Sequence, residues 1–151
     1  MKRLIIVAVA AFFILGVTLV AFAEEQGTKQ EAKALVDNAL TYIKANGKVK
    51  ALAEFNNPKG SFVAKDMYIF ALDMNGVFLA HGGNPKMAGK NQMKLQDADG
   101  KYLVKGLIIK AKSGGGWYDY KWANPLTKKI QDKSTYVMKV DDYLIGCGIY
   151  K

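Results

Sequence analysis

The hydrophobic pattern changes period near Gly60, and this change restricts the possible folds more than any other feature. Apolar residues recur at helical spacing over residues 28–45, where Thr28 and Glu31 have the spacing of an N-terminal capping box. After Gly60 the apolar residues gather in short runs of strand length, separated by turn signals. A chain with helices first and consecutive strands afterwards is expected to form an α+β domain.

Two helices are expected before this change. The first ends at Asn46-Gly47, a pair typical of a helix C-terminus. A second short helix is expected to follow, with four apolar residues directed inward: Val49, Leu52, Ala53 and Phe55. Turn-forming residues over 56–60 end it.

Strand patterns occupy most of the chain after Gly60. They cover residues 67–72, 77–80, 117–122, 133–140 and 143–150. Asn75-Gly76 between the first two is a strong hairpin signal. A long connection over 81–100 and a helix over 101–112, weakened by Gly106, precede the last three strands. The prediction is an antiparallel sheet of about five strands with helices at one side.

The N-terminus has the features of an export signal. A basic start precedes an apolar run from Leu4 to Val20, which ends at the cleavage motif Ala21-Phe22-Ala23. We expect residues 1–23 to be a signal peptide cut after Ala23, leaving residues 24–151 as one periplasmic or secreted domain. The apolar run is close to the shortest length that spans a bilayer, about 17 residues, so an uncleaved membrane anchor is the alternative.

Charge and cysteine content narrow the function further. The chain carries a formal net charge of +9, but its basic residues are scattered and its export signal makes nucleic acid an unexpected partner. Cys147 is the only cysteine, so no intramolecular disulfide can form and packing must stabilise the fold. We expect Cys147 to be a buried strand residue, with an intermolecular disulfide or a redox role as the alternative.

Several segments, taken in order, resemble one family of sensor domains. They are residues 66–73, 76, 79–85, 89–91, 97–101, 116–125, 133–137 and 146–150. Over residues 34–151 the chain resembles the single Cache domain family, type 2, found outside the membrane in bacterial receptors and histidine kinases. The resemblance implies a PAS-like fold with N-terminal helices packed along the sheet. It also implies that the domain senses a small ligand, often an organic acid, in a pocket over the sheet.

The resemblance also implies that the domain works with partner proteins in signal transduction such as chemotaxis. Receptors of this family continue through a second transmembrane helix into a signalling domain, whereas this sequence stops at Lys151. We therefore expect a stand-alone sensor that holds its ligand or passes a signal to a separate membrane receptor or histidine kinase. The alternative is a subunit that docks on such a protein without binding a small ligand. Related sensors pair through the N-terminal helix, so a homodimer is a further expectation.

Seven residues are predicted to contact the ligand. They are Tyr68, His81, Trp117, Tyr120, Trp122, Lys133 and Tyr136. The aromatic residues combine apolar bodies with polar tips, which suits a pocket for a small polar ligand; ordinary core packing is the alternative for each. Alternate residues of a strand share a face, so Tyr120 and Trp122 lie on one face and Trp117 on the other.

The polar contacts are expected from His81 and Lys133. His81 is the only histidine, and it would donate a hydrogen bond to an anionic or carbonyl ligand, with a structural role as the alternative. Lys133 matches the family pattern of a lysine followed closely by a tyrosine and would pair with a ligand carboxylate; a surface lysine is the alternative. Asp119 would bind a ligand amine, accept from the backbone, or pair with Lys121 or Lys133.

No catalytic site, metal site or cofactor is expected. A lone histidine cannot build a multi-histidine metal site. The segment 97–100 resembles a calcium loop, but Ile108 stands where an EF-hand needs glutamate. The glycines at 82–83 and 114–116 match no phosphate-binding fingerprint, and no nucleophile motif is present. The expectation is a binding protein and not an enzyme.

Overall fold

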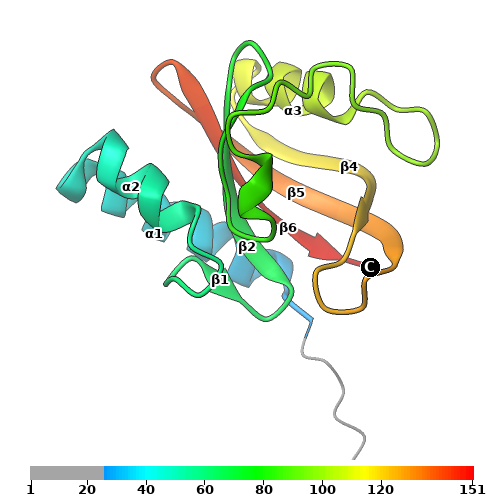
Figure 1. The fold of residues 1–151 in the computed structure, drawn as a ribbon, viewed down its shortest axis with the longest axis horizontal. Helices are drawn as coiled ribbons and strands as arrows, with labels where there is room; N and C mark the ends of the chain where they lie inside the picture. Colours follow the sequence, from blue (N-terminus) through cyan, green and yellow to red (C-terminus); the bar gives the residue numbers. More distant parts are fainter. Residues whose placement is uncertain (1–25) are drawn as a thin grey trace, which may run out of the picture.

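The computed structural model describes residues 26–151, so the predicted signal peptide lies outside the described residues. The elements follow the predicted order of helices and strands (Figure 1). The helices are α1 Lys29–Asn46, α2 Lys48–Phe55, the short 3-10 helix η1 Pro85–Met87 and α3 Leu103–Lys112. The strands are β1 Val63–Ala64, β2 Met67–Asp73, β3 Phe78–His81, β4 Gly116–Ala123, β5 Ile130–Val140 and β6 Tyr143–Tyr150.

The sheet is antiparallel and has six strands within the described residues. Its order is β1-β2-β6-β5-β4, and β3 also pairs with β2. The predicted hairpin is present: Asp73 N–H donates to the Val77 carbonyl at 2.9 Å, and Gly76 takes the positive φ of 84° that the turn needs. The α+β prediction is confirmed, and the additional strand is β1, which is only two residues long.

The capping box at the start of α1 forms as the sequence predicts. Glu31 N–H donates to the Thr28 hydroxyl at 3.2 Å, and Thr28 N–H donates to the Glu31 carboxylate at 2.8 Å. Lys65 also pairs with Glu31 at 2.7 Å. These contacts satisfy N–H groups of the first helical turn and fix where α1 begins.

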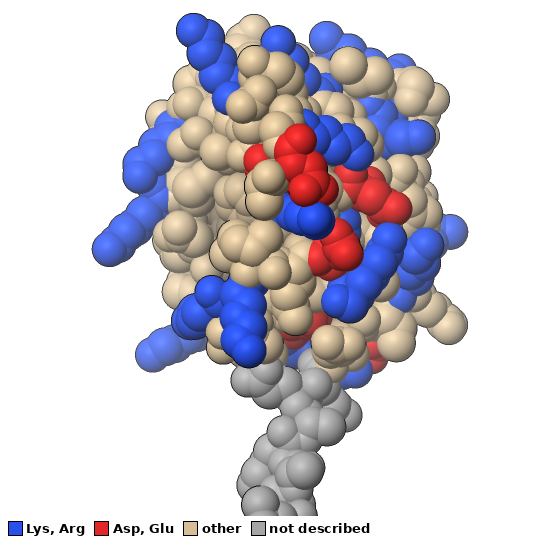
Figure 2. Space-filling model, turned by 90° about the vertical axis from the view of Figure 1, so that its right-hand side faces the viewer, with Lys and Arg blue, Asp and Glu red and all other residues tan. Residues whose placement is uncertain are grey.

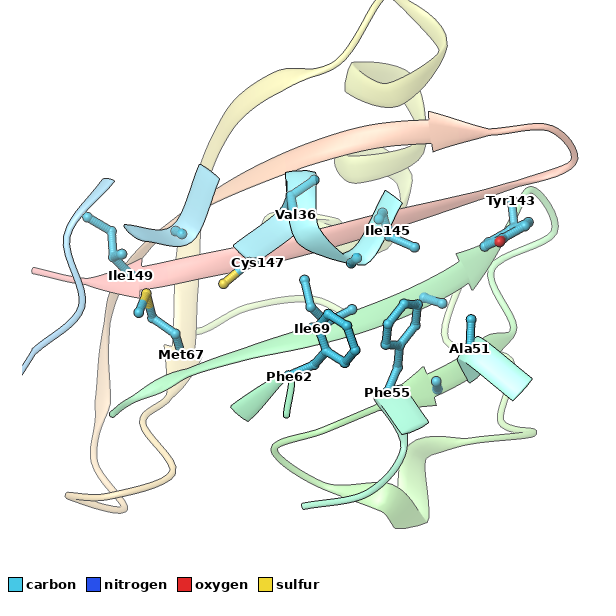
Figure 3. Packing of buried hydrophobic residues seen from close by; sticks show 14 residues of the cluster. Val36, Ala51, Phe55, Phe62, Met67, Ile69, Tyr143, Ile145, Cys147 and Ile149 are labelled. Carbon is cyan, nitrogen blue, oxygen red and sulfur yellow. The ribbon is translucent and has the colours of Figure 1, made fainter. Parts of the chain in front are cut away.

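The face of the sheet that packs against α1 and α2, here called the helical face, holds an apolar core. Val36, Phe55, Ile69 and Ile145 are fully buried there (Figure 3). The Phe55 and Phe62 rings meet edge to face with centroids 4.7 Å apart. Cys147 is buried in the same cluster, which confirms the prediction for this residue.

The prediction for α2 is partly wrong. Ala51 and Phe55 are its buried residues, whereas Val49 is 85% exposed and Ala53 is also exposed. Ala51 and Phe55 are four residues apart and therefore lie on one side of the helix. In so short a helix the apolar residues do not define a single stripe, so the sequence leaves the inward face ambiguous.

The opposite face of the sheet, here called the α3 face, packs against α3. Leu103, Leu107 and Ile108 of this helix are buried against Phe70 and Leu144 of the sheet. Gly106, which weakens the helical pattern, is required here because a Cβ at this position would overlap the Tyr118 ring. The glycine thus allows α3 to approach β4 closely.

Strand β4 lies at one edge of the sheet, and a short loop covers part of that edge. The Asp97 carboxylate accepts from Lys121 N–H at 3.0 Å, and the Lys101 ammonium donates to the Asp119 carbonyl. Asp97 also accepts from the N–H groups of Asp99 and Lys101, which holds the loop in a tight turn.

Candidate ligand-binding site

Lys133 is the central residue of the α3 face. Its side chain is 1% exposed, and its ammonium donates to the hydroxyls of Tyr68 at 2.7 Å and Tyr150 at 3.0 Å. No ion pair within residues 26–151 involves Lys133. Burial without an acidic partner lowers the pKa of Lys133 to about 7, although buried Asp66 exerts a weaker opposing effect. A buried ammonium group without an acidic partner favours the binding of an anion next to it.

The neighbouring strand β6 makes room for this lysine. A Cβ at Gly148 would overlap the Lys133 side chain, so only glycine leaves space for it there. Gly148 pairs with Thr135, whose hydroxyl is 2.9 Å from that of Tyr120. The aliphatic part of Lys133 therefore lies along β6 while its ammonium reaches the tyrosines.

His81 ends β3 and is a neutral hydrogen-bond donor. Its Nδ1 accepts from Asn84 N–H at 2.9 Å, so the proton of the neutral ring must lie on Nε2. Burial, reinforced by the charge of Lys133, lowers the pKa of His81 to about 3. The ring lies 4.7 Å from that of Tyr68, centroid to centroid. His81 thus offers an N–H without a positive charge.

A small enclosed cavity lies between these residues and α3. Its volume is about 10 Å³. It is lined by Tyr68, Phe70, Phe78, His81, Leu103, Leu107, Tyr120 and Trp122. The two leucines belong to α3, which forms the roof. This space holds about one water molecule.

A larger open cavity, here called the outer cleft, adjoins the enclosed one. It measures about 390 Å³ and shares the side chains of Tyr68, His81 and Trp122 with the enclosed cavity. The other residues that line it are Gly83, Asn84, Ala123, Asn124, Pro125 and Lys128. No acidic residue is among them. Gly83 lies close to Tyr68, since a Cβ there would be 2.7 Å from the ring.

A third cavity of about 250 Å³ opens beside the β4 edge and is charged. Figure 2 shows acidic and basic side chains side by side on this face of the molecule. Lys121 pairs with Asp99, and Lys151 pairs with Asp119, each at 3.1 Å. Asp119 therefore pairs with Lys151, and not with Lys121 or Lys133 as the sequence suggested. These charges compensate one another at the surface.

Five of the seven predicted site residues meet on the α3 face. They are Tyr68, His81, Tyr120, Trp122 and Lys133. Trp117 and Tyr136 do not join them. They pair directly across β4 and β5 and pack on the helical face, with ring centroids 5.4 Å apart. Because successive residues of a strand point to opposite faces of the sheet, both side chains lie on the face away from the Lys133 ammonium.

Tyr150 is the site residue that the sequence prediction missed. Its hydroxyl accepts from Lys133 and donates to the Ala123 carbonyl at 2.8 Å. It pairs directly with Lys133 in the β5–β6 register. The sequence predicts a strand that ends at Tyr150 but not how this strand aligns with β5. The contact between Tyr150 and Lys133 is therefore identified only by the β5–β6 register.

Solved structures of bacterial sensor domains share this fold. A methyl-accepting chemotaxis protein from Vibrio parahaemolyticus RIMD 2210633 has a similar structure, with a TM-score of 0.71 and 29% identity, covering 81% of this chain and 87% of that one. A Cache chemosensory domain, solved to explain carboxylic acid recognition, shares the fold with a TM-score of 0.62 and 24% identity, covering 80% and 86%.

The family itself is shown by the sequence. The model of the family "Single Cache domain 2" matches residues 16–151, and the chain belongs to this family. Sensor histidine kinase MctS of Rhizobium johnstonii (strain DSM 114642 / LMG 32736 / 3841) is 38% identical over 88 residues, which are 57% of this chain. The chain covers only 19% of the length of that kinase. The predicted family and PAS-like fold are thereby confirmed.

The remaining observations concern the location of the protein and metal binding. Single Cache domains are extracytoplasmic sensors. Within residues 26–151, no helix combines the length and apolar character needed to cross a membrane. The same residues contain no group of three or more histidine, cysteine, aspartate or glutamate side chains placed to hold a metal ion.

Proposed function

We propose that this protein is an exported sensor domain that binds a small carboxylate through Lys133. The observation that supports this most is the burial of the Lys133 ammonium without an acidic partner in the described part of the chain. A buried cation is costly unless an anion compensates it. A ligand carboxylate would provide that compensation and would accept charge-assisted hydrogen bonds.

The other polar groups of the site favour the same ligand class. His81 offers its Nε2 proton, and the hydroxyls of Tyr68 and Tyr150 surround the Lys133 ammonium. No acidic side chain lines the enclosed cavity or the outer cleft. An amine would find no counter-charge there, whereas a carboxylate would find several donors. The ligand is therefore a carboxylate and not an amine.

Binding requires the enclosed cavity to expand, since about 10 Å³ is too small for a carboxylate. The roof helix α3 is the element that would move. Glycines with positive φ flank it, Gly100 at 79° before it and Gly114 at 103° after it. Such residues can absorb backbone rotation at hinges. Ligand binding would thus displace α3 from the sheet.

The direct test is isothermal titration calorimetry with acetate and propionate near pH 6.5. The wild-type protein should bind at least one of them, and Lys133→Met should weaken binding by about 10-fold to 100-fold, the range expected for a hydrogen-bonded charge. Lys139→Met is the matched control, because Lys139 is an exposed lysine on the same strand. Binding by Lys133→Met at wild-type strength would contradict the proposal.

Location and signalling partner are the remaining parts of the proposal. Residues 1–23 act as a signal peptide cut after Ala23, in keeping with the extracytoplasmic family. N-terminal sequencing of the protein from its host would detect a start at Glu24, whereas retention of Leu4–Val20 would indicate an anchor. The similarity to a sensor kinase and a chemotaxis protein supports a separate receptor or kinase as the partner.

A further inference from the structure

We infer that the outer cleft is a second anion-binding subsite, with Lys128 as its cationic residue, and that the ligand is a small dicarboxylate. The inference rests on the proposed function, in which Lys133 binds one carboxylate. It adds a second carboxylate held by the cleft and a carbon chain that passes between the two lysines beside Trp122.

Lys133 itself lines the charged cavity beside β4, but two groups that contact its ammonium connect it to the outer cleft. Tyr68 lines the cleft, and its hydroxyl is 2.7 Å from Lys133 Nζ. The Tyr150 hydroxyl links Lys133 to the carbonyl of Ala123, another residue of the cleft wall, through hydrogen bonds of 3.0 and 2.8 Å. One layer of side chains therefore separates the buried cation from the open cleft. A ligand that is bound at Lys133 and is longer than a monocarboxylate has this space to extend into.

A fixed turn holds Lys128 at the cleft. Lys128 adopts a φ of 60°, which is uncommon for a lysine, and its N–H donates to the Asn124 carbonyl at 2.9 Å. Asn124 is 2% exposed, and its side-chain oxygen accepts from Leu126 N–H at 2.8 Å. The buried asparagine thus maintains a strained backbone at a residue of the cleft. Strain of this kind is concentrated at functional sites.

The charge of Lys128 is not compensated by the protein. Lys121 and Lys151 of the neighbouring charged cavity each pair with an aspartate, whereas Lys128 takes part in no ion pair within residues 26–151. Together with the absence of acidic residues from its lining, this gives the cleft a positive potential. Its volume of about 390 Å³ leaves room for the second half of a diacid.

The experiment compares acetate, propionate, succinate and glutarate by calorimetry on the purified wild-type protein, Lys128→Gln and Lys129→Gln. Lys129 is the matched control, because it is an exposed lysine next to Lys128 that does not line the cleft. In the wild type, one of the two diacids should bind about 5-fold to 30-fold more tightly than the monoacids, as expected for one added charged hydrogen bond. Lys128→Gln should abolish this advantage, and Lys129→Gln should preserve it.

The outcomes separate the two proposals. If monoacids bind as tightly as diacids, or if Lys128→Gln and Lys129→Gln behave alike, the subsite is refuted while carboxylate binding at Lys133 stands. If none of the four acids binds the folded wild-type protein, both proposals fail. Retention of the melting temperature in Lys128→Gln shows that a lost advantage does not come from unfolding, since an exposed lysine contributes little to stability.

Discussion

The two faces of the sheet bury different kinds of side chain. The helical face is mainly apolar and includes Phe55, Ile69 and Ile145. The α3 face has a comparable apolar cluster but also buries the Lys133 ammonium and His81. Apolar burial stabilises a fold, whereas an uncompensated buried cation opposes folding. In the proposed function, the helical face mainly stabilises the fold and the α3 face also binds the ligand.

The largest expected effect is on the helical face. Phe55→Ala should lower the free energy of unfolding by about 3–5 kcal/mol, because it leaves a cavity beside Phe62 in the core. Denaturant titration measures this loss. Carboxylate affinity, measured where the variant is still folded, should not change. A loss below about 1 kcal/mol, or a specific loss of affinity, would contradict the division between the faces.

The next effect is pH dependence on the α3 face. The pKa of Lys133 is about 7 in the folded protein against 10.5 for a free lysine, so the unfolded chain binds more protons between these values. Stability of the ligand-free protein should therefore rise across this window, by about 1.4 kcal/mol per pH unit at most. Carboxylate affinity should fall there by about 10-fold per unit, because binding needs the ammonium form.

Thermal unfolding and calorimetry between pH 6 and 10 measure these opposite trends. Lys133→Met is the control and should remove the contribution to stability. Parallel trends of stability and affinity in the wild type would show that Lys133 is not the titrating group.

A smaller effect separates the two tryptophans of β4. Trp122 lines both cavities on the α3 face, whereas Trp117 packs on the helical face. Trp122→Ala should weaken carboxylate binding by about 10-fold, and Trp117→Ala should lower stability by about 1–2 kcal/mol without changing affinity. Calorimetry and denaturation on both variants test this. Loss of affinity in Trp117→Ala alone would reverse the assignment of the faces.

The smallest expected effect concerns Cys147. Burial raises the pKa of its thiol to about 12, so the native protein should not react with a thiol reagent at neutral pH. Labelling should become rapid when denaturant unfolds the chain. Rapid labelling of the native protein, or an intermolecular disulfide, would show that the helical face opens more easily than its packing indicates.

The fold could be predicted where local signals were strong. The capping box at Thr28 and the turn at Asn75-Gly76 form as expected because each is fixed by neighbours in sequence. The two-residue strand β1 was not recognised, because two residues are too few to show strand alternation, although their partners Tyr68 and Met67 are near in sequence. The prediction for the inward face of α2 was wrong for a different reason, because packing against the sheet determines that face.

The site could be predicted in part for the same physical reason. Strand alternation places Tyr120 and Trp122 together correctly from the sequence. It also places Trp117 on the opposite face, whereas the face of Tyr136 depends on how β4 and β5 are aligned. The proton on His81 Nε2 follows from its bond to Asn84, and the contact of Tyr150 with Lys133 follows from the β6 register.

The loop at residues 97–101 has a consequence for the behaviour of the protein at high concentration. An uncovered edge strand offers backbone groups to which another chain can add a strand. Asp97 and Lys101 occupy one N–H and one carbonyl of β4, at Lys121 and Asp119, with charged side chains. A second molecule would have to displace both before its backbone could pair there. The loop therefore opposes edge-to-edge pairing of two molecules along this part of β4.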